Sequence, residues 1–348
     1  MKIYKNIFEK IIFVDNLFLA WDEFKKDKRN KIDVIRFERD LEKNIFELHW
    51  DLKEDEYRHG PYESFYITDP KLRHINKALV RDRILHHAVY SVINPIFEET
   101  FIPTSFSCRI GYGTHKGIDK LKEITGKVSK NNTNQCYQCY VLKCDIRKFF
   151  DSVDHKILIS IIKKRIKNDK TINLLEEIIE SFLSPFSNLF QRRGIPLGNL
   201  TSQLFANIYM NEFDQFVKQN LRIKNYIRYT DDFIIVSADK NYLGNLIPKF
   251  SKFLEKKLEL ELHPNKVMIG KLHKGIDFLG YIIFPNYRLV RTKTKRRIFS
   301  KLNKKFREYK IGKIDKLSFE RSLQSYLGVL SHADTYKVIQ QLKNQFWV

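Results

Sequence analysis

Two adjacent aspartates, Asp231 and Asp232, interrupt an apolar stretch and constrain the fold of this chain more than any other feature. The apolar runs on either side, residues 225–229 and 233–236, predict a β-hairpin with both carboxylates at its turn. Adjacent carboxylates repel each other, so a fold that keeps both ionised needs a cation beside them, and a divalent metal with oxygen ligands is the usual one. The alternative is a solvated Asp-Asp turn, which is the commoner fate of such a pair in isolation.

The overall charge indicates a polyanionic partner. The 348 residues are enough for two or three packed subdomains, and they carry a formal net charge of +22 with a pI near 9.6. Such a field attracts nucleic acid first and an anionic membrane surface second. No apolar run reaches the length of a membrane span, and the apolar stretch 11–14 is broken by Asp15 and Asn16, which argues against a signal peptide.

Four cysteines in a chain of this length indicate a reducing compartment rather than a disulfide framework, so we expect a cytoplasmic protein. Cys136 and Cys139 form a CxxC, and Cys144 follows closely. A zinc site would need a second ligand pair at suitable spacing, and none is evident, so metal binding there is the less favoured interpretation.

The N-terminal third predicts helices followed by a hairpin. Residues 1–60 are expected to form a helical extension, and residues 65–75 read as strand, turn and strand, with Pro70 in the turn. Lys71 and Arg73 alternate with Leu72, which puts both cations on one face. That face would suit a triphosphate, or be an ordinary exposed surface.

The next segment predicts a helix over residues 80–89 and a polar loop over 127–138. His86 and His87 are adjacent and therefore point to different faces of the helix. We expect one to face the core and the other to be exposed, which argues against a shared metal. The glycines at 111 and 113 are only weak evidence for phosphate binding.

A buried strand over residues 140–144 leads directly into Asp145, and a carboxylate at a strand end is where sheets commonly place chemistry. A helix over 156–162 should be capped near Asp154. Residues 192–203 form a Gly/Pro turn that enters a helix extending to Phe216, and the positive end of that helix suits an anion.

The C-terminal part alternates helices with one hairpin. An amphipathic helix is predicted over residues 242–262, then a break at 263–266, then a hairpin over 274–284. From Arg291 onward two helices are predicted. The first has a basic face that includes Arg296, Arg297, Lys301, Lys304 and Lys305. Phosphate contact is favoured over a merely solvated face.

Together, one strand-end carboxylate and a hairpin carboxylate pair can hold two Mg²⁺ ions roughly 3.5–4 Å apart. One ion would lower the pKa of an attacking hydroxyl and the other would neutralise a leaving pyrophosphate. This constellation indicates nucleotidyl transfer by in-line displacement, with Mn²⁺ as a possible substitute ion.

With these motifs in this order, residues 60–348 resemble the reverse transcriptases. The resemblance implies an α+β right-hand polymerase fold with an antiparallel palm sheet and a helical, basic thumb. The implied domains are an N-terminal extension (1–60), part of the fingers (61–135), the palm with inserted fingers elements (136–290) and the thumb (291–348).

The same resemblance implies residue roles. Asp145, Asp231 and Asp232 become the metal-binding catalytic acids, with the Ile146 carbonyl as a further ligand and Lys266 as the proton donor to pyrophosphate. Lys71 and Arg73 would bind the incoming triphosphate, and Phe150 would exclude a 2′-hydroxyl. Phe278, Leu279, Gly280 and Tyr281 match the primer grip, and the basic helices would track the duplex backbone.

The turn sequence Ile-Pro-Leu-Gly-Asn-Leu-Thr-Ser-Gln at 195–203 points to a subfamily. Most reverse transcriptases have Gln before the glycine and Ser-Pro at the end, whereas Leu197, next to Gly198, and Gln203 stand here. This variant resembles the bacterial and phage enzymes of diversity-generating retroelements, which copy a template RNA with errors opposite adenine. Loss of a polar side chain near the nascent pair is a physical route to low fidelity.

That subfamily implies dNTP substrates, a template RNA, a cDNA/RNA duplex and a basic, oligomeric accessory variability protein as partners, and no membrane. Two alternatives stay open. One is a related bacterial enzyme of phage defence or of another retroelement. The other is a non-catalytic RNA-binding scaffold, which would predict damage at the three aspartates, and all three are intact.

Overall fold

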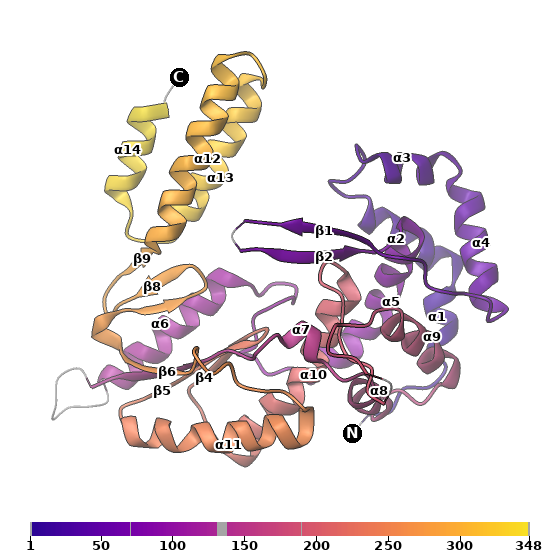
Figure 1. Cartoon of the computed structure of the whole chain (residues 1–348), viewed down its shortest axis with the longest axis horizontal. Coiled ribbons are helices and arrows are strands. Elements are labelled where there is room, and N and C mark those ends of the chain that lie inside the picture. The colour runs from indigo at the N-terminus through magenta and orange to yellow at the C-terminus, as the bar shows by residue number, and fades with distance from the viewer. Residues whose placement is uncertain (1, 70, 131–137, 189, 347–348) are drawn as a thin grey trace.

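The computed structural model describes residues 2–69, 71–130, 138–188 and 190–346. At its centre lies a four-stranded antiparallel sheet with strand order β4-β5-β3-β6, covered by helices (Figure 1). Its strands are β3 (Tyr140–Cys144), β4 (Tyr226–Tyr229), β5 (Asp232–Ser237) and β6 (Met268–Lys271). The predicted mixture of helices with antiparallel sheets is confirmed.

Alternation along the strands divides the core between the two faces of this sheet. Val141, Ile227 and Ile234 belong to one apolar cluster, together with helix α6 (Thr114–Lys130). Leu142 and Phe233 belong to the other, together with α10 (Leu200–Gln215) and α11 (Lys240–Leu258). Because successive side chains of a strand point to opposite faces, these short β-branched and aromatic runs bury both sides of the sheet.

A helical body surrounds α5 (Val80–Glu98) and supports the predicted hairpin. Its other helices are α1 (Phe8–Ile12), α2 (Val14–Phe24), α3 (Ile32–Arg39), α4 (Leu41–Lys53), α7 (Phe149–Ser152), α8 (His155–Lys163) and α9 (Asp169–Glu180). The Asp154 carboxylate caps α8, as predicted, by accepting a hydrogen bond from the Ile157 amide at 2.9 Å. The hairpin of β1 (Glu63–Ile67) and β2 (Arg73–Lys77) extends from this body toward the C-terminal helices (Figure 1).

The C-terminal part begins with a small antiparallel sheet. It contains β7 (Ile276–Phe278), β8 (Tyr281–Ile283) and β9 (Arg288–Val290), after a 3₁₀ turn at Leu272–Lys274. Three helices follow, α12 (Thr292–Lys310), α13 (Lys316–Ser331) and α14 (Tyr336–Phe346). Their apolar stripes meet around Phe319, whose ring lies 5.4 Å from that of Phe306 and 6.1 Å from that of Phe346.

Two expectations about the first half were wrong. His87 is half-buried rather than exposed, because its ring packs edge-on against Phe24 of α2 at 5.9 Å. Residues 127–130 belong to α6 and not to a polar loop, since Val128 continues the apolar stripe of that helix and packs against the same cluster. The rest of that predicted loop, residues 131–137, lies outside the described residues, as do Pro70 and Cys136.

The predicted helix over 242–262 was also too long. Helix α11 ends at Leu258, where Glu259 adopts a left-handed conformation with φ of 50°. The chain then runs extended beside the residues that follow β3: the Arg147 amide donates to the Glu261 carbonyl, and the His263 amide donates to the Asp145 carbonyl, each at 2.8 Å. Strands β6 and β9 and helices α9 and α14 were not predicted. Beyond α10 the helix continues as a π-helical turn, Phe216–Asn220.

Among the residues described, none of the helices combines the length and the apolar character that crossing a bilayer requires.

The buried imidazole of His86 makes stability depend on pH. Burial, followed by the neighbouring His59, holds the pKa of His86 well below 6.5, and neither ring nitrogen has a hydrogen-bond partner. As the pH falls, the unfolded chain binds a proton at His86 at a higher pH than the folded protein does. The free energy of unfolding therefore keeps its full value above about pH 6.5 and decreases as the pH is lowered. We expect His86→Leu to remove up to about 1.4 kcal/mol per pH unit from the slope of unfolding free energy against pH. Urea titrations between about pH 7 and 5 measure it. The exposed His273→Leu variant is the control, and an unchanged slope in His86→Leu would contradict the prediction.

Candidate active site

The three predicted aspartates meet at one end of the central sheet. The turn between β4 and β5 contains Thr230 and Asp231, and Tyr229 pairs with Asp232 across it. Cys144 pairs with Phe233, so Asp145, the next residue after β3, comes beside Asp232. Alternation puts Asp145 and Asp232 on the face that α6 covers further along the sheet.

Burial and neighbouring carboxylates raise the pKa values of Asp231 and Asp232. Burial, then the charges of Asp232 and Asp145, raise the pKa of Asp231 to about 6. Burial raises the pKa of Asp232 as well, with Asp145 adding to the effect through its charge and a side-chain hydrogen bond. The charged forms of Asp231 and Asp232 are therefore disfavoured in this site, and a bound cation would favour them.

Two lysine ammonium groups lie close to these carboxylates. The Lys266 ammonium lies 3.0 Å from a carboxylate oxygen of Asp145. Lys143, two residues before Asp145 on β3, lowers the pKa of Asp232 and donates a hydrogen bond to the Asp277 carbonyl at 3.0 Å. Lys266 was predicted at the site and Lys143 was not, although its spacing of two from Asp145 puts it on the same face of the strand.

The donor set fits a hard divalent cation, because carboxylate and carbonyl oxygens are the ligands such ions prefer. Within the described residues, however, no group of three or more His, Cys, Asp or Glu side chains is arranged to hold a metal ion. The thiols offer no alternative among the described residues: Cys139 is buried, and burial raises its pKa to about 11.

The turn at 195–199 is held against the β1–β2 hairpin. The Asn76 amide donates to the Leu197 carbonyl at 3.0 Å, and the Asn199 side-chain amide donates to the Asn76 carbonyl at 2.8 Å. Gly198 has a φ of +115°, and a Cβ there would lie 2.8 Å from Ile75, so only glycine fits. Lys71 and Arg73 are exposed on this hairpin and make no ion pair within the part of the chain described.

Phe150 joins the same region to the strand end. Its half-buried ring packs edge-on against Phe149 at 5.4 Å, and its carbonyl accepts a hydrogen bond from the Ile195 amide at 2.8 Å. Ile146 has a buried side chain and bridges to Leu262. The segment after Asp145 is thus held by Leu262 on one side and by the turn at 195–199 on the other.

The segment 278–281 forms the turn between β7 and β8. Leu279 and Gly280 both have positive φ, 49° and 91°, which suits a tight two-residue hairpin. The Tyr281 hydroxyl donates to the Val329 carbonyl of α13 at 3.0 Å, and Lys143 holds the other end at Asp277. The hairpin therefore links the aspartates to the C-terminal helices.

The basic face of α12 is partly engaged within the protein. Asp69, at the tip of the β1–β2 hairpin, pairs with Arg297 at 3.3 Å and with Lys301. Lys304 lies 4.0 Å from Glu308, and Lys305 donates to the Ser322 hydroxyl at 2.6 Å. Arg296 is exposed. The cations predicted to bind a nucleic-acid backbone lie together on one helix, and two of them hold the hairpin tip.

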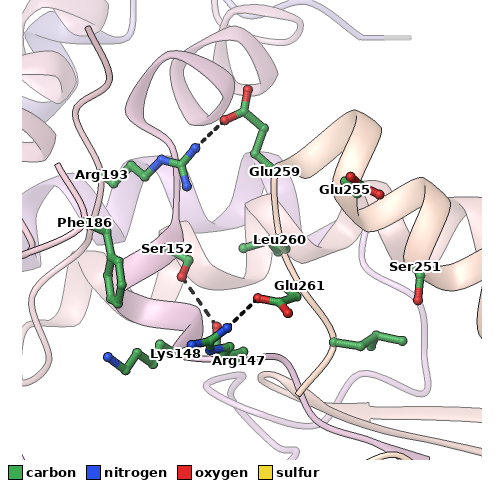
Figure 2. Close-up of a pocket in the computed structure, with 11 residues that line it drawn as sticks. Arg147, Lys148, Ser152, Phe186, Arg193, Ser251, Glu255, Glu259, Leu260 and Glu261 are labelled. Carbon is green, nitrogen blue, oxygen red and sulfur yellow. Dashed lines mark hydrogen bonds and ion pairs between the residues drawn. The ribbon is translucent and has the colours of Figure 1, made fainter. Parts of the chain in front are cut away.

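A pocket of about 740 Å³ opens beside Arg147, near the aspartates but not lined by them (Figure 2). Two of its three cations pair with glutamates: Arg147 lies 3.0 Å from Glu261, and Arg193 lies 2.7 Å from Glu259. The third, Lys148, has its ammonium 4.5 Å from the centre of the Phe186 ring. Positive and negative side chains line this pocket in equal number, and it does not extend the candidate active site.

Comparison with known proteins shows the family of this chain. Residues 68–283 match the family model described as reverse transcriptase (RNA-dependent DNA polymerase). This chain belongs to the reverse transcriptase family.

Its relatives differ in length. Protein YkfC of Escherichia coli is 27% identical over 275 residues, covering 69% of each chain. The group II intron-encoded protein LtrA of Lactococcus lactis is 23% identical over 308 residues, covering 70% of this chain and 50% of LtrA. The chain thus spans half the length of LtrA.

Solved structures support the fold. The telomerase of Candida albicans, solved with a fragment of telomeric RNA, superposes with a TM-score of 0.51 at 12% identity, covering 85% of this chain and 63% of that one. Apo telomerase from Candida tropicalis gives 0.50 at 13% identity, covering 72% and 53%. Both agree with a right-hand polymerase fold.

The contact between the hairpin tip and α12 makes a prediction. We expect Asp69→Asn to tighten binding of an RNA/DNA duplex about two- to fivefold at low salt, because phosphates no longer compete with a carboxylate for Arg297 and Lys301. Fluorescence anisotropy over a salt series measures it. Asp119→Asn, which removes an exposed carboxylate paired with Arg288 instead, is the matched control. Equal affinity of Asp69→Asn and wild type would show that the contact does not compete with nucleic acid.

Proposed function

We propose that this protein is an RNA-directed DNA polymerase whose active site is formed by Asp145, Asp231 and Asp232 with two Mg²⁺ ions, or Mn²⁺ in their place. The observation that carries the proposal is the gathering of these three carboxylates at one end of the central sheet, with the pKa of Asp231 raised to about 6 by burial and by its neighbours. Membership of the reverse transcriptase family supports the same reaction.

The proposed division of the chain follows the right-hand plan. Residues 61–135 contribute to the fingers, 136–290 form the palm with inserted fingers elements, and 291–348 form the thumb, after an N-terminal extension over 1–60. Template RNA and the cDNA/RNA duplex would lie between the β1–β2 hairpin and α12, where the excess of cations meets phosphate. The turn at 278–281 would hold the primer end over the aspartates.

In the proposed reaction the primer 3′-hydroxyl oxygen attacks the α-phosphorus of a dNTP. A new P–O bond forms, the bond to pyrophosphate breaks and the hydroxyl proton is lost. The bound ions supply a lowered pKa for the hydroxyl and neutralise the pyrophosphate. The Ile146 carbonyl would add to the ligand set.

The other side chains bind and orient the reactants. Lys71 and Arg73, exposed and without ion-pair partners in the described part of the chain, would bind the triphosphate. Phe150, held by Phe149 and by the turn at 195, would lie under the sugar and exclude a 2′-hydroxyl. Lys266 would give a proton to the leaving pyrophosphate once it has left Asp145, to which it now donates.

Replacing one carboxylate tests this proposal. We expect Asp231→Asn to lower nucleotide incorporation about a hundredfold or more while leaving RNA affinity nearly unchanged, because the amide removes a metal-binding charge without removing volume. Single-nucleotide extension and filter binding measure the two quantities. Asp239→Asn is the matched control, since Asn also caps α11. Wild-type extension by Asp231→Asn would remove this residue from the site.

We further propose that the enzyme belongs to the diversity-generating type and makes error-prone cDNA from a template RNA with a basic accessory protein, in a bacterial or phage-infected cytoplasm. The feature that supports it is the sequence motif at 195–203, with Leu197 and Gly198 in the turn and Gln203 in the first turns of α10. The Leu197 side chain is only half-buried, and its carbonyl accepts a hydrogen bond from the Asn76 amide of the β1–β2 hairpin. An aliphatic group there cannot make the hydrogen bond that a glutamine makes to a correctly shaped pair.

We expect Leu197→Gln to lower misincorporation opposite adenine several-fold, with little change at other template bases, because it restores a polar contact at that position. Sequencing of cDNA made on a defined RNA template measures it. Leu183→Gln, at an exposed leucine, controls for the added amide. An identical error spectrum in Leu197→Gln and wild type would leave Leu197 with a packing role only.

Primer extension by the wild-type protein separates the candidates. DNA product with errors concentrated opposite adenines supports the diversity-generating type. Faithful product keeps the polymerase and favours phage defence or another retroelement. Tight RNA binding with no product, even with cognate RNA and accessory protein added, would favour the non-catalytic scaffold.

A further inference from the structure

Beneath the aspartate hairpin lies a fully buried ion pair that sequence analysis did not anticipate. The side chains of Arg228 on β4 and Asp214 on α10 are both 0% exposed. The Arg228 guanidinium donates to both carboxylate oxygens, with Nε–Oδ1 at 2.8 Å and Nη2–Oδ2 at 2.6 Å. The Tyr226 hydroxyl donates to the same carboxylate at 2.6 Å.

A buried ion pair of this kind adds little net stability to a core. Removing two charges from water costs several kcal/mol per ion, and well-packed apolar residues of similar volume often do as well or better. The guanidinium also makes contacts beyond this pair, and these give it a second role.

The remaining nitrogen points to the turn. Arg228 Nη1 donates to the Thr230 carbonyl at 3.0 Å and to the Asn207 side-chain oxygen at 3.2 Å. Thr230 in turn donates from its hydroxyl to the Ser107 hydroxyl at 2.6 Å. The Asn207 amide donates to the Ser107 carbonyl at 2.9 Å, which closes the network around the turn.

The turn needs such support. Thr230 has a φ of 56°, in the left-handed region that a β-branched residue rarely occupies. The first position of a two-residue hairpin with positive φ normally carries glycine or asparagine. A strained conformation of this kind persists only where its surroundings impose it. Here two hydrogen bonds hold Thr230, one on its carbonyl and one on its hydroxyl.

Arg228 acts without touching the reactants. It pairs with Phe233 and, by strand alternation, lies on the α10 face of the sheet, whereas Asp232 lies on the opposite face. Its guanidinium is wholly buried among Asp214, Asn207 and the turn backbone. Any effect on chemistry must pass through the position of Thr230 and of Asp231 after it.

We propose that Arg228, held by Asp214, is a positioning residue: its bond to the Thr230 carbonyl sets the strained turn that places the Asp231 carboxylate in the active site. The inference rests on the proposed polymerase function. It assigns to a buried ion pair the geometry of a carboxylate in the adjacent turn, where a displacement of about 1 Å lowers a rate up to 100-fold.

The test pairs Arg228→Lys with Thr230→Gly. A lysine keeps the charge for Asp214 but cannot also bind the turn carbonyl, so we expect kcat to fall about 10- to 100-fold with the KM for dNTP little changed. Adding Thr230→Gly, which reaches positive φ without support, should recover most of kcat. Failure of glycine to recover kcat, or wild-type kcat in Arg228→Lys, would overturn the proposal.

A second readout is independent of turnover. We expect weaker Mn²⁺ binding by calorimetry in Arg228→Lys and recovery in the double variant. Arg165→Lys, at another buried arginine whose ion pair is with Glu99, is the matched control and should lose stability without losing kcat. Activity that tracks stability equally in both lysine variants would indicate a structural role alone.

If Arg228→Lys does not fold, the turn itself still tests the inference. Thr230→Val keeps the β-branch but removes the hydroxyl bond to Ser107, so its kcat should lie below that of Thr230→Gly; the reverse order would overturn the proposal. Asp231→Asn in the wild-type background tests the polymerase function separately. Loss of activity there with no effect of Arg228→Lys refutes only the positioning role.

Discussion

The antiparallel pairing of β3 with β5 is the constraint on which the rest of the structure depends. It puts Cys144 opposite Phe233 and so brings Asp145 beside Asp232. A slip of one residue would turn every side chain to the other face, carrying Val141 and Leu142 into the wrong core clusters and separating the carboxylates. The apolar residues that fill both faces therefore hold the register that the charged end of the sheet requires, against the mutual repulsion of its aspartates.

Much of this architecture could be predicted from local patterns. The strand before Asp145, the hairpin at Asp231, the cap at Asp154 and the helices after Arg291 each follow from a period or a capping residue within a few positions. Where prediction failed, distant residues decided the outcome. Helix α11 stops at Leu258 because the next residues run beside those after Asp145, and His87 is half-buried because Phe24 of another helix covers it.

The site shows the same division. Asp145, Asp231, Asp232 and Lys266 were predicted, and the structure brings them together, because their sequence contexts differ from ordinary surface charge. The sequence contexts of Arg228 and Asp214 have no such distinguishing pattern. A buried arginine cannot be told from an exposed one in sequence until its partner, here 14 residues away, is known to face it. The geometry of the predicted residues thus depends on residues that only the tertiary structure reveals.

Charge links this site to the nucleic acid it would bind. The chain has an excess of 22 positive charges, yet Arg297 and Lys301 of α12 hold Asp69, and Lys266 holds Asp145. In each of these pairs a carboxylate occupies a cation that a phosphate would favour. The pairs of Asp69 are half-exposed and contribute little to stability, so exchanging this carboxylate for phosphate costs little. Binding of a duplex would then release Asp69 from α12 and separate the hairpin tip from that helix, while a triphosphate would compete with Asp145 for Lys266. The exchange at Lys266 would leave the Asp145 carboxylate without its ammonium partner and so available to a metal ion.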